Sequence, residues 1–207
     1  YDHTENERLR RAISWKYQRE LMAATPDPAN VIRKKKNSSM VLGLKMLSDG
    51  LGDAFVSAGS TGALLSGATL VVKRVKGIRR AAMAPAFPNK AGGKTIICDC
   101  GANAECTPEF LLQFGLIGSL YAKKYLGVEN PKIGLLNIGT EDTKGTPLQK
   151  EAYAKLQKAH EQGLINFVGN VEGSDLVSDY ADVIVTDGFS GNLLLKCAES
   201  VGKAAMQ

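Results

Sequence analysis

Histidine and aromatic residues are scarce in this chain of 207 residues, which has 2 His, 1 Trp and an aromatic fraction of 6%. So few aromatic side chains argue against a carbohydrate-stacking groove or a platform for single-stranded nucleic acid. The longest nearly apolar stretch, residues 63–72, contains Ser66, Gly67 and Thr69 and is far shorter than the roughly 20 residues that cross a bilayer. The 4 Cys are too few and too crowded for a disulfide framework, and residues 1–4 show no signal-peptide pattern. These absences predict a soluble, cytosolic globular protein.

Positive charge is in modest excess, with 26 Lys+Arg against 21 Asp+Glu and a net charge of +5. The basic residues gather in two runs, Arg33–Lys36 and Lys73–Arg80. Each run is either a solvated face or a docking surface for phosphate, an acidic protein or anionic lipid. No helix-turn-helix, zinc-finger or RNP pattern accompanies these charges, so we expect no nucleic-acid partner.

A short apolar run, a loop of small polar residues and a helical segment recur along the chain. The runs that predict strands are residues 54–56, 95–98, 133–136, 165–168 and 181–185, with residues 81–84 as a further strand stopped by Pro85 and Pro88. Predicted helices cover residues 5–23 and 40–47, the second closed by Asp49-Gly50, and begin again at Thr107-Pro108 and Thr146-Pro147.

Buried strands that alternate with helices pair in parallel through right-handed crossovers. We therefore expect a three-layer α/β/α fold with a mostly parallel sheet over residues 31–207, preceded by an irregular or helical segment over residues 1–30. No linker, repeat array or low-complexity tract predicts separate domains.

Ligands of open parallel sheets bind beyond the carboxyl ends of the strands. The loops at those predicted ends are residues 57–62, 99–103, 137–145, 169–173 and 186–192, and each contains glycine. Glycine lets backbone N–H groups approach a ligand closely, and the helix N-termini that follow favour anions. These loops predict a phosphate-binding site.

Two glycine-containing patterns near these loops do not predict a nucleotide-binding site. Residues 92–95 have a Walker A-like ending, but the required first glycine falls on Pro88 and a strand follows. Gly59 and Gly62 lack the G-x-G of the dinucleotide fingerprint.

The cysteines and histidines also fail to form a familiar catalytic or metal site. Cys98, Cys100 and Cys106 lack zinc spacing, which favours buried structural thiols. His3 and His160 both lie outside the loops, so we expect no Ser-His-Asp or Cys-His machinery and no metal or cofactor.

What remains is a site of amides, Asn and Ser/Thr donors, and the candidate lysines Lys144 and Lys196. Without an evident protein nucleophile, such a site suits a reaction in which a bound anion attacks. Lys196 is either a site residue or a surface lysine of the helix that begins near Gly191.

The loops belong to a set of motifs in a specific order and spacing: Ile32–Met40, Val56–Leu64, Cys98–Asn103, Gly134–Gly139, Asn166–Gly173 and Thr186–Asn192. This set resembles the phosphate acyltransferase family, PlsX, of bacterial fatty acid and phospholipid synthesis. The family usually has Asn where Ser60 stands and Thr where Ser190 stands. Its opening strand and Asp-Ala-Met-Gly-Gly-Asp loop have no counterpart here, and its final helix is cut short after Gln207. The resemblance therefore implies a fragment or a chain with missing segments.

The resemblance further implies transfer of a fatty acyl group from the thioester of acyl carrier protein to inorganic phosphate, giving acyl phosphate. It implies a fold similar to isocitrate and isopropylmalate dehydrogenases and phosphotransacetylases, a homodimer, and peripheral association with the membrane. No cofactor is implied. The alternatives are a short-chain acetyl or butyryl transferase that uses coenzyme A thioesters, and a noncatalytic scaffold at the membrane.

On this basis we expect a catalytic group and a phosphate-binding group of residues. The expected catalytic residues, which orient phosphate or the carbonyl, are Asn103, Asn137, Asn192 and Lys196. The expected phosphate-binding residues are Ser60, Thr61, Gly62, Lys144, Asp187, Gly188, Ser190 and Gly191. Within the second group we expect Asp187 to order its loop rather than act as a base.

Overall fold

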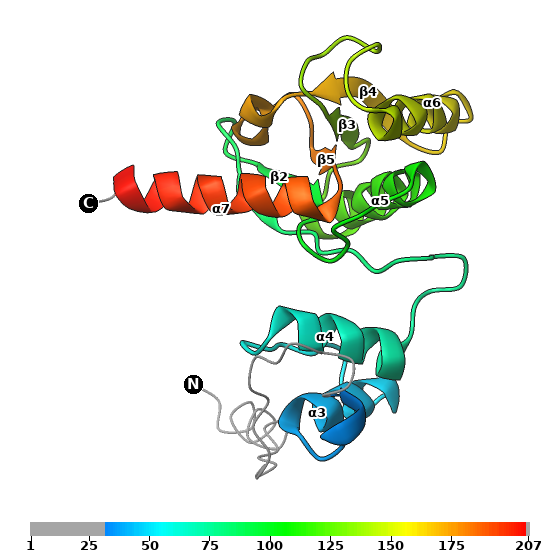
Figure 1. Cartoon of the computed structure of the whole chain (residues 1–207), viewed down its shortest axis with the longest axis vertical. Coiled ribbons are helices and arrows are strands. Elements are labelled where there is room, and N and C mark those ends of the chain that lie inside the picture. Colours follow the sequence, from blue (N-terminus) through cyan, green and yellow to red (C-terminus); the bar gives the residue numbers. More distant parts are fainter. Residues whose placement is uncertain (1–31, 206–207) are drawn as a thin grey trace, which may run out of the picture. The chain divides into compact units, whose positions relative to one another are not determined.

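The computed structural model describes residues 32–205, so the predicted helix over residues 5–23 and the segment 1–30 lie outside the described residues. The chain divides into two compact units, Tyr1–Val75 and Lys76–Gln207, here called the N-terminal and C-terminal units (Figure 1). This division falls inside the span 31–207 that the sequence analysis treats as one domain.

The N-terminal unit is helical where it is described. Its elements are α3 (Ser39–Ser48), α4 (Thr61–Gly67) and the π-helix η1 (Ala68–Val72). Helix α3 confirms the predicted helix over residues 40–47: the Ser38 hydroxyl accepts the Val41 N–H at 3.4 Å, and Gly50 follows the helix with φ +73°. Its buried residues Met40, Val41 and Leu44 pack against Ile32 and Ala63.

The predicted strand over residues 54–56 is wrong, because no strand forms there. The Phe55 ring instead packs into the helical core of the N-terminal unit, over Gly43, while Val56 is 93% exposed. This short apolar run pairs with no strand in the described structure, and its aromatic side chain is partly buried against α3. The Ser57–Gly62 loop therefore follows no strand.

The C-terminal unit is built on a five-stranded sheet in the order β1-β2-β5-β3-β4. The strands are β1 (Ala86–Pro88), β2 (Lys94–Cys98), β3 (Lys132–Leu136), β4 (Asn166–Val171) and β5 (Val183–Val185). Strands β2, β5, β3 and β4 pair in parallel, and only β1 is antiparallel, so the mostly parallel sheet is confirmed.

The predicted strand over residues 81–84 is wrong as well. The first strand of the sheet lies just beyond it, at Ala86–Pro88, and pairs with β2 as an edge strand. Proline cannot donate to a ladder but is tolerated at such an edge, so Pro88 ends the strand without preventing it.

Helices cover both faces of this sheet, which confirms the α/β/α layers (Figure 1). On one face lie α5 (Pro108–Tyr121), with its π-helical end η2 (Ala122–Leu126), and α6 (Pro147–Glu161). On the other lie the 3-10 helix η3 (Gly173–Val177) and α7 (Gly188–Ala205). Adjacent strand residues alternate between the two layers: Ile96 packs under α5 and α6, and Ile97 under η3 and α7. No helix within residues 32–205 is long and apolar enough to cross a membrane.

The predicted helix starts at Thr107-Pro108 and Thr146-Pro147 are confirmed, since each proline is the first residue of its helix. At α6 the side-chain oxygen of Gln149 accepts the Thr146 backbone N–H at 3.2 Å, which completes a capping box. These caps set the points at which the loops after β2 and β3 end.

Candidate functional site

Polar loops gather at the carboxyl edge of the parallel strands in the C-terminal unit. They are residues 99–103 after β2, residues 137–145 after β3 and residues 186–187 after β5, and the rest of the predicted loop 186–192 is the first turn of α7. Gly169 and Asn170 belong to β4 itself, so the predicted loop 169–173 begins only at Glu172. Ser60, Thr61 and Gly62 lie in the N-terminal unit, where the Ser60 hydroxyl caps α4 by accepting the Ala63 N–H at 3.4 Å.

Asp99 is fully buried and organises the loop after β2. Its Oδ1 accepts the backbone N–H groups of Met83 at 2.9 Å, Cys100 at 2.6 Å and Ala102 at 3.2 Å. Its Oδ2 accepts the backbone N–H of Asn103 at 2.7 Å and the Asn103 side-chain amide at 2.9 Å. Sequence reasoning assigned Asp99 no role. An Asp directly after a buried strand, where its carboxylate meets the next backbone amides, is the signal that identifies it.

Asn103 joins this loop to its neighbours. Its Nδ2 donates to the Ala81 carbonyl at 2.8 Å as well as to Asp99, and its own carbonyl accepts the Gly188 N–H at 2.8 Å. Both side-chain N–H groups are therefore used inside the protein. In this arrangement Asn103 holds the loops together and does not offer its amide to a ligand.

Asp187 orders the start of α7. Its Oδ1 accepts the Ser190 N–H and its Oδ2 accepts the Ser190 hydroxyl, both at 2.8 Å, and its carbonyl accepts the Gly191 N–H at 3.0 Å. The hydroxyl hydrogen of Ser190 thus points at Asp187. The expected phosphate donors Ser190 and Gly191 are occupied within their own loop.

Gly188 and Gly191 are buried because two main-chain segments meet at them. A Cβ on Gly188 would lie 2.6 Å from the Asn103 carbonyl oxygen and 2.8 Å from Asp99 Oδ2. The absence of a side chain at these positions lets α7 approach the loop after β2.

Asn192 differs from the other predicted asparagines. It is exposed, and within residues 32–205 its side chain makes no hydrogen bond. A Cβ on Gly101 would lie 3.6 Å from Asn192 Oδ1, so this side chain sits beside the Gly101 turn, where φ is +108°. Gly101 is an exposed residue too, and its N–H has no acceptor in the described part of the chain. Together they leave neighbouring hydrogen-bond donors open at the carboxyl edge.

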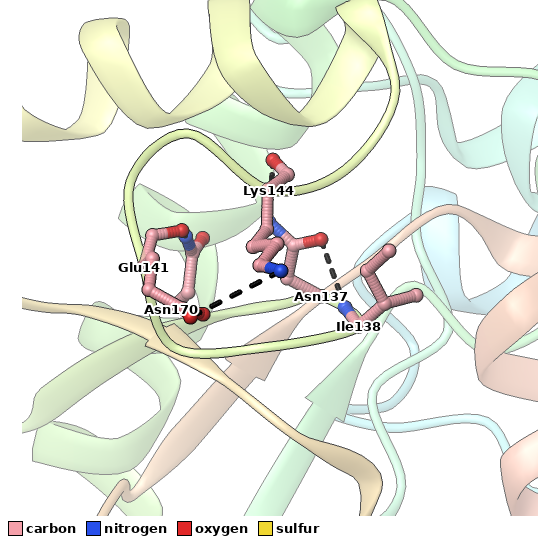
Figure 2. A network of polar contacts seen from close by, with 5 residues as sticks. All are labelled: Asn137, Ile138, Glu141, Lys144 and Asn170. Carbon is pink, nitrogen blue, oxygen red and sulfur yellow. Dashed lines mark hydrogen bonds and ion pairs between the residues drawn. The ribbon is translucent and has the colours of Figure 1, made fainter.

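The loop after β3 closes on itself through Asn137 (Figure 2). Asn137 Oδ1 accepts the Ile138 N–H at 2.8 Å, and Nδ2 donates to the Lys144 carbonyl at 3.1 Å. The side chains of Lys144 and Glu141 point toward one another, with Nζ 4.0 Å from Oε1 and exposed fractions of 49% and 60%. Asn137 therefore shapes the loop, and the Lys144 ammonium stands at its surface in a loose ion pair.

Lys196 lies on the exposed side of α7, where its Nζ donates to Glu199 Oε2 at 2.9 Å. Its side chain is 62% exposed. Of the alternatives open from the sequence, this geometry is that of a surface lysine paired one turn along its own helix.

The cysteines are free thiols in unreactive surroundings, apart from the exposed Cys197. Cys98 and Cys100 are buried, as predicted, whereas Cys106 is only partly buried. Burial, followed by the charge of Asp99, raises the pKa of the Cys100 thiol to about 11. Burial also raises the pKa of Cys106 to about 11. At neutral pH these groups stay protonated, so neither is a nucleophile.

Other candidate groups lie away from this edge. The Gly92 and Gly93 N–H groups donate to the carbonyl and side chain of Asn89 at 3.2 and 2.9 Å, in the turn before β2, so they offer no phosphate loop. His160 Nδ1 lies 3.2 Å from the backbone nitrogen of Phe167, near the start of β4. Within residues 32–205 no group of three or more His, Cys, Asp or Glu side chains is placed to hold a metal ion.

The sequence pattern of the family described as "Fatty acid synthesis protein" matches residues 3–207. The chain belongs to this family. It is 46% identical over 187 residues to the phosphate acyltransferase of Clostridioides difficile strain 630, covering 90% of this chain and 54% of that protein. It is 50% identical over 177 residues to the phosphate acyltransferase of Alkaliphilus oremlandii, covering 86% and 51%. The chain thus spans about half the length of these relatives.

Solved structures of phosphotransacetylases share the fold. The enzyme from Streptococcus pyogenes matches with a TM-score of 0.65 and 20% identity, over 84% of this chain and 58% of that one. EutD phosphotransacetylase from Staphylococcus aureus matches with a TM-score of 0.62 and 21% identity, over 98% and 73%. At this level of identity the likeness establishes the α/β fold alone.

Proposed function

We propose that the protein is a phosphate acyltransferase that moves a fatty acyl group from acyl carrier protein to inorganic phosphate, giving acyl phosphate for phospholipid synthesis. Family membership and relatives named phosphate acyltransferase support this activity. The observation that carries it is chemical: the Gly101 N–H and the Asn192 amide have no partner within residues 32–205, and the Lys144 ammonium at the same edge is held only by a loose ion pair to Glu141.

Such a site favours attack by an anion that it binds. An oxygen of hydrogen phosphate attacks the thioester carbonyl carbon, and a tetrahedral oxyanion forms. When it collapses, the C–S bond breaks, and the thiolate of the carrier takes up the proton that phosphate brought. Preorganised N–H donors stabilise the oxyanion without reorganising during the reaction. The protonated Cys100 and Cys106 fit this scheme, since no protein nucleophile is needed.

The described contacts suggest how the expected residues divide the work. Asn192, beside Gly101, is proposed to face the oxyanion, and Lys144 to neutralise phosphate. Asn103, Asn137 and Asp187 hold the loops that carry these groups.

The remaining expected site residues are proposed to contribute charge or further contacts to phosphate. Lys196 is proposed to add positive charge from α7. Ser60, Thr61 and Gly62 at the start of α4 stay predicted phosphate ligands. Ser60→Ala tests them by the KM for phosphate.

Acyl carrier protein, a second copy of the chain and the membrane surface are proposed partners. The exposed members of the runs Arg33–Lys36 and Lys73–Arg80 offer positive charge to an acidic carrier. Charge steering of this kind weakens with ionic strength, so kcat/KM for acyl carrier protein should fall as salt rises.

The decisive assay supplies the full-length protein with phosphate and either an acyl carrier protein thioester or a coenzyme A thioester, and follows acyl phosphate by ³¹P NMR. We expect turnover with a long-chain acyl carrier protein thioester. Turnover with short-chain coenzyme A thioesters alone would identify a short-chain transferase. No turnover, together with no phosphate binding by calorimetry, would identify a scaffold.

Asn192→Ala tests the site within that assay. Because the Asn192 side chain makes no hydrogen bond in the described structure, its loss should leave the melting temperature unchanged. Loss of an oxyanion donor lowers kcat by roughly 100-fold or more. Asn166→Ala is the control: Asn166 begins β4, at the end of the sheet opposite to the carboxyl edge, and this variant should keep full activity. Unchanged turnover in Asn192→Ala would remove this residue from the mechanism.

A further inference from the structure

Asn170 combines burial with an unsatisfied polar atom. It lies in β4 and is only 2% exposed. Its Nδ2 donates to the Glu141 carbonyl at 2.7 Å, on the loop after β3. Its Oδ1 is buried and has no hydrogen-bond partner within residues 32–205. Figure 2 shows the side chain reaching from the strand toward Glu141.

A β-bulge aims this side chain at the loop. The pairing of β3 with β4 steps from Ile133↔Phe167 to Gly134↔Gly169, which leaves Val168 as an extra residue. As a result, Val168 and Val171 pack in the same layer, under η3 and α7, although they are three positions apart. Such a bulge shifts the alternation of a strand and re-aims its side chains.

The new register places Asn170 on the side of α5 and α6. Asn170 pairs with Leu135, whose side chain belongs to the core under these helices. The same side carries the loop of residues 137–145, which leads directly into α6. The Asn170 amide therefore contacts this loop from the strand β4, on the face of the sheet that α5 and α6 cover.

The amide of Asn170 is therefore only half satisfied within residues 32–205: its Nδ2 is bonded, and its Oδ1 has no protein partner. A buried acceptor without a partner is unfavourable, and an apolar residue of similar shape removes that penalty. The only hydrogen bond the side chain makes in the described structure goes to the loop that presents Lys144. Buried polar atoms without a partner are unfavourable, and exceptions of this kind are characteristic of functional sites.

We propose that Asn170 is a positioning residue of the phosphate site: its amide holds the loop of residues 137–145 at Glu141 and so keeps the Lys144 ammonium at the carboxyl edge for the substrate anion. This inference rests on the proposed function. It makes the affinity for phosphate, rather than the chemical step, depend on a residue that does not touch the substrate.

Asn170→Ala in the full-length protein separates this role from a structural one. We expect the KM for phosphate to rise at least about tenfold, as for one lost charge-assisted contact, while kcat stays within about threefold. The melting temperature should fall by no more than about 4 °C, because the unsatisfied oxygen is removed together with the Nδ2 hydrogen bond to the Glu141 carbonyl. Asn166→Ala, at the other end of the same strand, removes a partly buried side chain that donates a long hydrogen bond of 3.4 Å to the Asn130 carbonyl, and it should leave kcat and the KM for phosphate unchanged.

A double-mutant cycle with Lys144→Gln tests the route of the effect. If Asn170 acts through Lys144, Asn170→Ala should raise the KM for phosphate in the wild type but not in the Lys144→Gln background. Asn170→Leu, which keeps a similar volume but has neither donor nor acceptor, supplies the same comparison should the alanine variant fail to fold.

Two results would overturn the inference: an unchanged KM for phosphate in an active Asn170→Ala protein, or a fall in stability and kcat with no change in that KM. Equal effects of Asn170→Ala in both backgrounds would overturn the route through Lys144. A wild-type protein that makes no acyl phosphate and binds no phosphate would instead refute the proposed function.

Discussion

The α-carbon of Gly191 lies directly against the main chain of Asp99, so that a Cβ at position 191 would collide with the Asp99 carbonyl oxygen. The Gly191 carbonyl in turn accepts the Cys100 thiol at 3.3 Å. Strands β2 and β5 are neighbours in the sheet, and this contact joins the loops at their carboxyl ends. The candidate site is therefore shaped by main-chain packing before any ligand is bound.

Gly191→Ala should destabilise the C-terminal unit. The new methyl group meets backbone, which cannot rotate away, and overpacking of this kind costs about 1–3 kcal/mol. Urea denaturation measures the loss as a lower midpoint. Gly202→Ala is the matched control on the same helix, because nothing lies within 4 Å of its Cβ. There the better helix propensity of alanine should stabilise the protein by up to about 1 kcal/mol. Equal effects at both positions would contradict the packing argument.

Asp99→Asn should be more damaging than a surface change of the same kind. The neutral side chain replaces a carboxylate oxygen with an NH₂ group that faces N–H donors, and a hydrogen bond to a charged acceptor contributes about 1.5–3 kcal/mol. We expect a loss of about 3 kcal/mol or more in the free energy of unfolding. Asp142→Asn, on an exposed loop residue, should change it by less than about 0.5 kcal/mol. A mild effect at Asp99 would mean that the network does not hold the loop.

The thiols should react in a fixed order. Cys197 is exposed, whereas the thiols of Cys100 and Cys106 have pKa values raised from 9.0 to about 11. At about pH 7.5 iodoacetamide should therefore label Cys197 first, and Cys197→Ser should remove the fast phase. Labelling of Cys100 and Cys106 should accelerate as the pH approaches about 11, because the thiolate is the nucleophile. Mass spectrometry of the modified peptides gives the order. Early labelling of Cys100 at neutral pH would contradict its burial.

The ion pair between Glu109 and Lys155 should make stability depend on acid. Lys155 Nζ lies 2.8 Å from Glu109 Oε1, and this contact lowers the pKa of Glu109 from 4.5 to about 2. The contribution of the pair to the free energy of unfolding is fully present above the ordinary pKa of Glu, and it is lost as the pH falls toward about 2. Thermal melts of the wild type and Glu109→Gln should differ at about pH 6 and converge in acid or in about 1 M salt. Glu151→Gln, an exposed change on α6, the helix of Lys155, serves as control. A difference that persists in acid would contradict the assignment.

Much of the sheet could be predicted because its signals are local. The runs at residues 95–98, 133–136, 165–168 and 181–185 correspond to β2, β3, β4 and β5, with small shifts at the ends. Proline at the first position of α5 and of α6 marked those helix starts equally well. The run at residues 54–56 failed because the burial of Phe55 against a helix is a nonlocal event.

The site was predicted less completely than the fold. Its loops were found from their glycines and polar residues, but residue type did not reveal where each side chain points. Asn103 and Asn137 use their amides inside the protein, whereas Asn192 keeps its amide free. The role of Asn170 depends on the bulge between β3 and β4, and a strand sequence alone does not disclose its register with a partner.

The sequence by itself determined the family and the alternation of strands and helices, and it predicted a site poor in histidine that relies on amides and lysine. The tertiary structure decided which donors meet solvent, that Asp99 is the buried anchor of the first loop, and that Asn170 faces the loop of Lys144. The physical reason is that apolar periodicity and turn chemistry act between near neighbours in the chain. The hydrogen bonding of a loop is settled by segments such as Ala81, Asp99 and Gly188, which meet only when the sheet has formed.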